Sequence, residues 1–444
     1  MTHITVDPDE VAGLARDLIA IESHKDARGR EAGVPRFLVD WFRARGADAD
    51  VSPALDGRPN VVARVHLGGP GPTLLLNGHL DTVPAGDMRD AFTPRVEDGV
   101  LWGRGACDMK GAVAAMACVL AATARELPAM RSATPGDDAA MACVLAATAR
   151  QLPSSSSAGS VGEPSLRPRA AGRGSAGSSP GAGRALLFVG TVDEETGSLG
   201  VKKLVESGLT ADYAVVGEPT CLRVAVAHKG ACFIRITLTG RGAHGSCPEK
   251  GVNAASYGAR VLVALEETLR PRLARRTHPL LGRSTVSVGR ISGGTEPNIV
   301  AERCELDVDR RTLPGEADAV AEVRELVSSI CDGVDGLSYG VGEMDRTANV
   351  PHVALGTAPD SRLALACRMA CRDAGIPAEP VGVTYWTDGA HLAANGIETV
   401  ILGPGDIAHA HGPNDHVAVD DLVKAAEVYA GIVERLLAGG CPGS

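Results

Sequence analysis

The chain has 444 residues, which is too long for one ordinary domain and suits two or three. Its hydrophobic content of 44% is that of a globular protein with a core, and its net charge of -10 comes from acidic and basic residues interspersed along the chain. No basic stripe follows the pattern of a phosphate-binding surface, so we expect no nucleic-acid partner.

The N-terminus and the cysteines indicate the cellular compartment. No apolar run reaches the ~18–20 residues that span a bilayer, and the acidic, amphipathic segment 1–23 does not have the pattern of a signal peptide. Eleven cysteines lie at irregular spacing without a CxxC motif. Cys367 and Cys371 have helical spacing, and we interpret them as thiols of the core or surface in preference to metal ligands. We therefore expect a cytoplasmic protein with free thiols and no membrane partner.

The first 222 residues alternate between helix and strand patterns. Helical periodicity covers 8–22 and 31–46, the second ending at Gly46. The elements predicted next are strands 60–65, 73–77 and 100–102, helix 111–127, strand 185–192, helix 199–207 and strand 214–216. This alternation predicts an α/β fold with a mainly parallel sheet flanked by helices.

Residues 129–184 interrupt the alternation. The segment is rich in Ser, Gly, Pro and Ala, and its start repeats its neighbour: AAMACVLAATARELP at 114–128 returns as AAMACVLAATARQLP at 139–153. So close a copy indicates a local tandem duplication. We expect the second copy to dock outside the fold or to form nothing stable, and residues 154–184 to be disordered. The insertion is predicted to carry no chemistry.

The pattern changes at about residue 223 and changes back at about 336. The elements predicted in between are strand 231–239, helix 252–269, strands 285–291 and 302–310, helix 317–331 and strand 337–342. This β-α-β-β-α-β order is that of a ferredoxin-like α+β domain. Helix 361–374, strands 381–384 and 399–402, and helix 419–437 then resume the first pattern. We predict a catalytic domain formed by 1–222 and 336–444, a smaller inserted domain at 223–335, and a site in the cleft between them.

Two motifs in the first part place polar side chains at the ends of structural elements. In TLLLNGHLDTVP, His79 and Asp81 follow the buried strand 73–77. A metal-bound imidazole needs an acceptor for its other ring nitrogen, and a carboxylate two residues on can supply one. In LWGRGACDMKG, Asp108 lies in a Gly-rich turn before a helix, and taken alone the motif favours a role in capping that helix. Neither motif is diagnostic alone.

Further carboxylates follow the next strands. Glu194 and Glu195 are adjacent at a strand end, where a cation or a shared proton would relieve their repulsion. One of them can bind a metal while the other acts as a general base. Glu218 follows a short apolar strand, where a charge is costly unless it faces a cleft or a metal. Three histidines crowd the chain after strand 399–402: His409, His411 and His416.

Mixed nitrogen and oxygen donors of this kind suit Zn²⁺, Co²⁺ or Mn²⁺ better than Mg²⁺. Five such ligands can hold two ions with a bridging carboxylate and leave room for a bridging hydroxide. We therefore expect two divalent ions, with zinc as the first choice and cobalt or manganese as alternatives.

Six motifs together carry a resemblance to a known family. In chain order they are GHLDTVPAGD, GRGACDMKG, DEETGS, GEPT, GAHGSCPEKGVNA and HGPND. They resemble the motifs of the M20 metallopeptidase family, which includes acetylornithine deacetylase, succinyl-diaminopimelate desuccinylase, aminoacylase and glutamate carboxypeptidases. The resemblance covers essentially the whole chain except 129–184. One departure is Asp415, at a position where the family often has Glu.

The resemblance implies a ligand set for two metals. His79 and Glu218 would bind one ion, Glu195 and His411 would bind the other, and Asp108 would bridge the two. His411 is preferred to the two neighbouring histidines because it begins the HGPND match.

The resemblance also implies roles in catalysis. Asp81 would orient His79, and Glu194 would be the general base that deprotonates the bridging water and then protonates the leaving amine. In GRGAHGSCPEKG of the inserted domain, His244 would reach an active site across a dimer interface and stabilise the tetrahedral oxyanion.

Residues implied in substrate binding lie in three further segments. Asn298 in GGTEPNIV and Arg311 in DRRTLPGE would hold a substrate carboxylate, and Asp388 in WTDGAH would lie near the substrate. Arg310 is the alternative to Arg311, because adjacent residues on a strand point to opposite faces and only one can enter the cleft.

The implied activity is hydrolysis of an N-acyl amino acid by a homodimer, with a deacetylase or desuccinylase as the first choice. The alternative is a dipeptidase or carboxypeptidase with the same metals. A third hypothesis, a non-catalytic binding relative, predicts the loss of Glu194 or of a ligand, and neither is lost. The sequence leaves open the acyl group, the amino acid, the native metal and the pathway.

Overall fold

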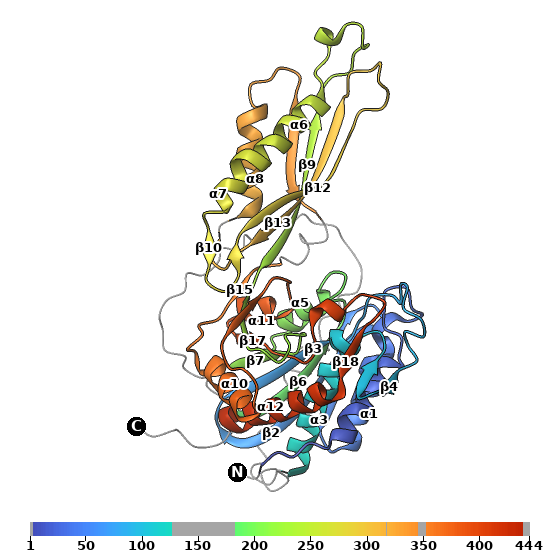
Figure 1. Cartoon of the computed structure of the whole chain (residues 1–444), viewed down its shortest axis with the longest axis vertical. Helices are drawn as coiled ribbons and strands as arrows, with labels where there is room; N and C mark the ends of the chain where they lie inside the picture. The colour runs from blue at the N-terminus through green and yellow to red at the C-terminus, as the bar shows by residue number, and fades with distance from the viewer. Residues whose placement is uncertain (1–2, 127–182, 317, 345–351, 438–444) are drawn as a thin grey trace, which may run out of the picture.

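The structure of the chain is a computed structural model that describes residues 3–126, 183–316, 318–344 and 352–437. It has a larger lobe from which a smaller, elongated lobe extends (Figure 1). The predicted helical copy at 139–153 and nearly all of the predicted insertion lie outside the described residues. Gly183 and Arg184, which we expected to be disordered, form the start of a strand.

A nine-stranded sheet forms the centre of the larger lobe. Its order is β1-β2-β6-β3-β7-β17-β8-β15, with β16 beside β8. The strands are β1 (Asp48–Leu55), β2 (Arg58–Pro70), β3 (Thr73–His79), β6 (Gly183–Thr191), β7 (Tyr213–Val216), β8 (Ala225–His228), β15 (Leu355–Gly356), β16 (Val381–Val383) and β17 (Glu398–Ile401). The run β6-β3-β7-β17 is parallel, whereas β1, β2 and β15 pair antiparallel with their neighbours. The sheet is therefore mixed, with its parallel part in the middle.

Helices cover both faces of this sheet. One face carries α1 (Pro8–Ile19), α2 (Gly33–Ala44), α3 (Gly111–Glu126), α10 (Arg362–Asp373) and α12 (Val419–Leu437), and the other carries α5 (Leu199–Glu206) and α11 (Gly389–Ala394). The strand periodicity of two is visible in β3, where Leu74 and Leu76 pack in the first core and Leu75 packs in the second. Such two-sided burial explains the continuous apolar run of this strand.

The segment 106–126, which includes α3, is long and apolar enough to cross a membrane by length and composition. We expected no segment to qualify. Its most apolar stretch is entirely buried within the larger lobe, where α3 packs against α1, α12 and the sheet. A helix that is surrounded by protein on all sides is apolar on all sides, which explains its composition.

The smaller lobe contains a four-stranded antiparallel sheet of order β12-β13-β9-β14. Its elements are β9 (Gly230–Thr239), α6 (Ala254–Ala264), α7 (Arg270–Leu273), β10 (Thr277–His278), β11 (Gly282–Arg283), β12 (Thr285–Gly293), β13 (Arg303–Thr312), α8 (Ala319–Cys331) and β14 (Ser338–Glu343). Ile234 and Ile236 of β9 pack with Val261 of α6 and Val323 of α8 in a core of their own. The order of the main elements is the predicted split β-α-β-β-α-β order.

A three-stranded sheet lies beside the main sheet and positions two of the predicted motifs. It contains β4 (Arg95–Glu97), β5 (Val100–Trp102) and β18 (His416–Ala418), in the order β18-β5-β4. His416 pairs with Trp102. This pairing brings the segment after β17, which contains His411, next to the turn that leads from β5 to Asp108.

Candidate metal centre

The predicted ligands follow the carboxyl ends of neighbouring parallel strands. His79 is the last residue of β3, Glu194 and Glu195 follow the end of β6, and Glu218 follows the end of β7. Since β6, β3 and β7 are adjacent and parallel, their ends meet at one edge of the sheet. Ligand sites of open α/β sheets lie at this edge.

His79 and Asp108 form the buried centre of the site. The His79 Nδ1 atom lies 3.0 Å from the backbone oxygen of Asp81, and its Nε2 atom lies 2.9 Å from Asp108 Oδ1. A carbonyl oxygen can only accept a hydrogen bond, so Nδ1 carries a hydrogen and Nε2 faces the carboxylates. The Glu218 Oε1 atom lies 3.9 Å from the same Nε2 atom. The imidazole is therefore held as a metal ligand would be, with Nε2 directed at the acidic cluster.

His411 contacts the other side of Asp108. Its Nε2 atom lies 3.0 Å from Asp108 Oδ2 and 2.9 Å from Glu195 Oε1. The two carboxylate oxygens of Asp108 thus face the two different histidines, as a bridging carboxylate would. His411 has a φ of 61°, a left-handed conformation that is uncommon for a residue with a Cβ and that persists where the surrounding structure enforces it.

The pKa values in the cluster reflect crowded negative charge. Burial and the neighbouring carboxylates raise the pKa values of Glu195 and Glu218, and burial would raise that of Asp108 too. Hydrogen bonds from His411 and His79 hold the pKa of Asp108 below its usual range instead. Contacts with Asp108 and Glu195 raise the pKa of His411 to about 10. The raised pKa values of Glu195 and Glu218 reflect buried, crowded carboxylates, and the two histidines supply the positive charge that offsets this for Asp108.

The carboxylate of Asp81 contacts the Glu194–Glu195 turn more closely than it contacts His79. Its Oδ2 atom accepts a hydrogen bond of 2.9 Å from the backbone N–H of Glu195, and its Oδ1 atom accepts one of 3.2 Å from that of Glu194. The distance from Oδ1 to His79 Nδ1 is 3.6 Å, which is too long for a good hydrogen bond. The carboxylate therefore holds the turn, while the backbone carbonyl of Asp81 orients the imidazole.

Glu194 and Asp388 lie beside the cluster. Burial, followed by the charges of Glu218, Asp388 and Glu195, raises the pKa of Glu194 well above its usual value, despite the opposing charge of His79. Asp388 accepts a hydrogen bond of 2.8 Å from the hydroxyl of Thr191 at the end of β6, and burial raises the pKa of Asp388 to about 7. A raised pKa is a property that a carboxyl group needs to act as a general acid–base.

The donor set fits a divalent metal. One nitrogen or oxygen of each of His79, Asp108 and Glu195 lies within 4.8 Å of the others. The Nε2 atom of His411 contacts Asp108 and Glu195 of this group, and the carboxylate of Glu218 lies 3.9 Å from His79. Two imidazoles and three carboxylates are the mixed donors that Zn²⁺, Co²⁺ or Mn²⁺ accept.

The residues predicted in the smaller lobe do not join this cluster within one chain. The segment 240–253 between β9 and α6 lies at the end of the smaller lobe that is remote from the larger lobe (Figure 1). It contains His244, whose Nδ1 atom lies 2.7 Å from Ser246 Oγ. Asn298 is beside it, because its backbone oxygen accepts a hydrogen bond of 2.7 Å from Gly245. Arg311 lies at the opposite end of the sheet, opposite Ala231 of β9. Asn298 and Arg311 of one chain therefore do not converge on one carboxylate.

Arg310 and Arg311 point to opposite faces of β13, as strand geometry requires. Arg310 is fully buried, and its Nη2 atom donates to Glu316 and Glu322 at 2.8 and 3.1 Å. Arg311 is partly exposed on the other face and pairs with Asp309 at 2.9 Å. The guanidinium of Arg310 is therefore held by ion pairs inside the smaller lobe.

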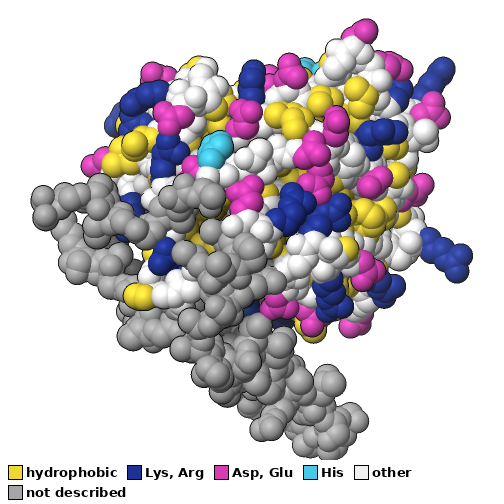
Figure 2. Space-filling model, turned by 90° about the horizontal axis from the view of Figure 1, so that it is seen from below, with side chains coloured by type: hydrophobic (Ala, Val, Ile, Leu, Met, Phe, Trp, Pro, Cys, Tyr) yellow, Lys and Arg dark blue, Asp and Glu magenta, His cyan; other side chains and the backbone are white. Residues whose placement is uncertain are grey.

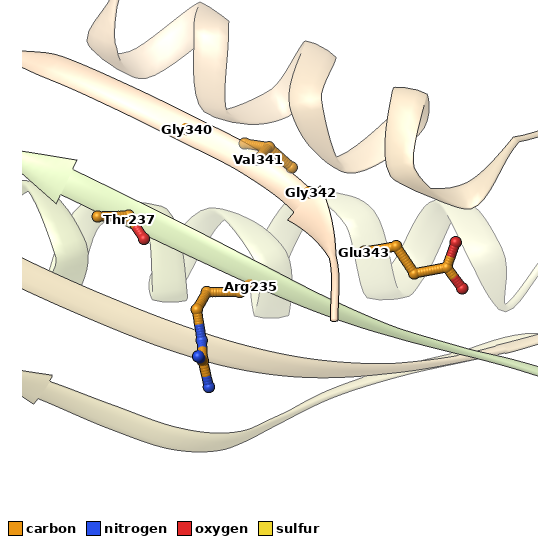
Figure 3. A pocket seen from close by; sticks show the side chains of 6 residues that line it. All are labelled: Arg235, Thr237, Gly340, Val341, Gly342 and Glu343. Carbon is orange, nitrogen blue, oxygen red and sulfur yellow. The ribbon is translucent and has the colours of Figure 1, made fainter. Parts of the chain in front are cut away.

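Two surface features lie outside the cluster. A hollow of about 370 Å³ lies on the smaller lobe, lined by Arg235 and Thr237 of β9 and by residues 340–343 of β14 (Figure 3). It contains none of the predicted site residues. On the face of the larger lobe in Figure 2, acidic and basic side chains are interspersed, as the sequence suggested.

Three buried charged residues near the centre were not predicted from the sequence. Arg104 and Asp415 pair with each other, and Lys110 donates a hydrogen bond of 2.6 Å to the backbone oxygen of Ile21. Burial lowers the pKa of Lys110 to about 7. A signal was present, since Arg104 and Lys110 stand inside the GRGACDMKG motif. Nine cysteines, Cys367 and Cys371 among them, are free in the described part of the chain.

Comparisons with known proteins identify relatives of this chain. Peptidase family M20/M25/M40 matches residues 75–132, and a peptidase dimerisation domain matches residues 226–334. An acetylornithine deacetylase of Myxococcus xanthus is 30% identical over 90% of this chain and 92% of its own length, and one of Proteus mirabilis (strain HI4320) is 27% identical over 95% of each. The crystal structure of aminopeptidase PepT from Bacillus cereus has a TM-score of 0.71 at 19% identity, covering 97% of this chain and 99% of that one.

The structural neighbour supports the fold, an α/β domain joined to a dimerisation domain, and the similarity of the deacetylase spans nearly the full length of both proteins. With the M20 motifs, these findings decide the family. The chain belongs to the M20 metallopeptidase family and is a metal-dependent hydrolase of amide bonds.

Proposed function

We propose that this enzyme is a deacylase that hydrolyses an N-acyl amino acid, with a deacetylase as the first choice. The observation that carries the choice of substrate is the full-length similarity to two acetylornithine deacetylases. The alternative is a dipeptidase or carboxypeptidase, because the same donor set serves all of these reactions. We assign no role as a non-catalytic binding protein, because Glu194 and the five proposed ligands are all present.

We assign the ligands as His79 and Glu218 on one ion, Glu195 and His411 on the other, and Asp108 between the two. Bound divalent ions, zinc first and cobalt or manganese as alternatives, would lower the pKa of water and polarise the scissile carbonyl. The two-sided contacts of Asp108 and the buried carboxylates crowded around Glu218 support this assignment.

Glu194 is the proposed general base. Its raised pKa lets it take a proton from the attacking water and return that proton to the nitrogen of the leaving amine. Asp81 keeps this carboxylate in place by binding the backbone of the turn that carries it. Asp388 is proposed to lie near the bound substrate, with its position fixed by Thr191.

The site is proposed to be completed by a homodimer. His244 and Asn298 share the far end of the smaller lobe, so a second copy is needed to bring them to a catalytic centre. There His244 of one copy would stabilise the oxyanion, while Asn298 of that copy and Arg311 of the other would bind the substrate carboxylate. The match to a dimerisation domain supports this arrangement. The homologues and the free cysteines support a cytoplasmic location.

A hydrolysis screen tests the proposal. The metal-loaded enzyme is incubated with N-acetyl, N-succinyl and N-formyl amino acids and, separately, with dipeptides, and release of the free amine is measured. Preferred turnover of an N-acyl amino acid is expected. Turnover of dipeptides alone would favour the alternative, and His244→Ala with unchanged turnover would contradict the role of the second copy.

A further inference from the structure

A buried ion pair lies next to the proposed metal centre, and neither of its residues is a proposed ligand. Arg104 and Asp415 are each 1% exposed, and Nη1 of Arg104 lies 3.2 Å from Oδ2 of Asp415. Burying two charges costs several kcal/mol per ion unless their hydrogen bonds are made. The contacts of this pair therefore indicate what it holds together.

The guanidinium of Arg104 joins two loops to its own. Its Nε atom donates to the backbone oxygen of Pro84 at 3.2 Å, and its Nη2 atom donates to those of Ala85 and Gly412 at 3.0 Å each. Pro84 and Ala85 follow His79 and Asp81 along the chain, and Gly412 follows His411. Only the planar, multidentate head of arginine can reach such a set of acceptors at once.

The carboxylate of Asp415 binds the backbone that leads to Asp108. Its Oδ2 atom accepts a hydrogen bond of 2.7 Å from Gly105 N–H, and its Oδ1 atom accepts one of 2.9 Å from Cys107 N–H. The backbone oxygen of Asp415 also accepts one of 3.1 Å from Gly103. The loop before Asp108 is thus fastened to the segment that follows His411.

We propose that the Arg104–Asp415 pair is a positioning device for the two-metal centre, fixing the separation between Asp108 and His411 and anchoring both to the His79 loop. The proposal rests on the proposed ligand set. His411 needs such support, because its side chain is 50% exposed and its left-handed backbone persists only where the surrounding structure enforces it. Residues that orient ligands in this way typically contribute ~10–100-fold to metal affinity.

Two substitutions test the two side chains of the pair separately. Arg104→Lys keeps the charge but cannot bind Pro84, Ala85 and Gly412 together. Asp415→Asn keeps the shape but loses the charge and one of its two acceptor oxygens. Each is expected to weaken metal binding by ~10–100-fold, with the larger loss at the ion proposed to be held by Glu195 and His411. In a double-mutant cycle the two losses should not add, since the side chains act as one unit.

The test measures metal binding, which is independent of the substrate. Protein freed of metal by chelation is titrated with Zn²⁺ or Co²⁺ against a competing chelator, and the Tm of each metal-free variant is recorded. Glu10→Gln is the matched control, because it breaks the partly buried Arg45–Glu10 pair (2.6 Å) between α1 and the end of α2. A variant that only destabilises the fold should lower Tm and leave both metal affinities unchanged.

Wild-type affinity for both ions in Arg104→Lys and Asp415→Asn would overturn the proposal, and so would an equal loss in Glu10→Gln. Weakened metal binding in both variants but not in the control supports it. If the wild-type protein binds two ions but hydrolyses no N-acyl amino acid, the proposed substrate fails while the positioning role stands. Wild-type protein that binds no divalent ion would overturn both.

Discussion

Replacing Asp81 with Asn separates two possible roles of this carboxylate. An Asn side chain has one oxygen where Asp has two, so it can accept from the N–H of either Glu194 or Glu195 and must direct its NH₂ group at the other. The lost charge-assisted bond and the unpaired N–H together cost about 2–4 kcal/mol. The backbone carbonyl that orients His79 is unaffected by the substitution.

The expected result is a selective loss of turnover. Displacing the general base forfeits part of its typical ~10²–10⁴-fold contribution, so we expect kcat to fall about 100-fold or more while the His79 side keeps its metal. The assay compares kcat and metal content of Asp81→Asn with those of His79→Ala, which lacks a proposed ligand. Asp50→Asn, at an exposed position of β1, is the matched control.

Two outcomes would refute this reasoning. Wild-type kcat in Asp81→Asn would mean that the carboxylate does not hold the catalytic turn. Metal loss equal to that of His79→Ala would mean that its main role is to orient the imidazole, as we inferred from the sequence.

Three further predictions concern the metals, a buried histidine and a glycine. Chelation should abolish turnover and lower Tm, and Zn²⁺, Co²⁺ or Mn²⁺ should restore both; activity that survives complete metal removal would contradict the ligand set. Burial lowers the pKa of His228 to about 4 from 6.5, so the folded state binds fewer protons than the unfolded state in this window and stability falls as pH falls through it. The free energy of unfolding in urea should therefore differ less between pH 4 and pH 7 in His228→Leu than in wild type, by at most roughly 3 kcal/mol. The same difference in both proteins would show that His228 is not buried in its neutral form. A Cβ on Gly200 would lie 2.2 Å from the backbone oxygen of Val192, so Gly200→Ala should lower the free energy of unfolding by ~2 kcal/mol or more. Gly13→Ala, with open space around the new Cβ, should not lower it. Equal unfolding midpoints of the two variants would contradict the close packing of Gly200 against Val192, next to the Glu194–Glu195 turn.

The strands that deliver the ligands could be predicted because their signals are local. The apolar run of β3 and the motif residues after β3, β6 and β7 are contiguous in sequence, and parallel pairing then brings them together. The edge strands β1 and β15 were missed. The hairpin of β1 and β2 is formed by the turn Asp56-Gly57, a typical hairpin signal, yet β1 has no clear alternation of apolar residues. This hairpin pairs antiparallel with the parallel strands, which makes the sheet mixed.

Side-chain partners far apart in the chain could not be predicted. The sequence assigned Asp81 to His79 because the two are neighbours, whereas its carboxylate binds a turn more than a hundred residues away. Arg104 and Asp415 are separated by 311 positions, and no local pattern links them. The separation of Asn298 from Arg311 likewise depends on the antiparallel register of β9 and β13.

The central claim is that Glu194 transfers the proton in amide hydrolysis at a metal centre that it does not itself bind. The most direct measurement compares turnover of an N-acetyl amino acid by wild type and Glu194→Gln, with the metal content of the same samples. We predict a loss of turnover of at least ~100-fold with an unchanged number of bound ions. Near-wild-type turnover, or loss of metal in parallel with turnover, would contradict the assignment.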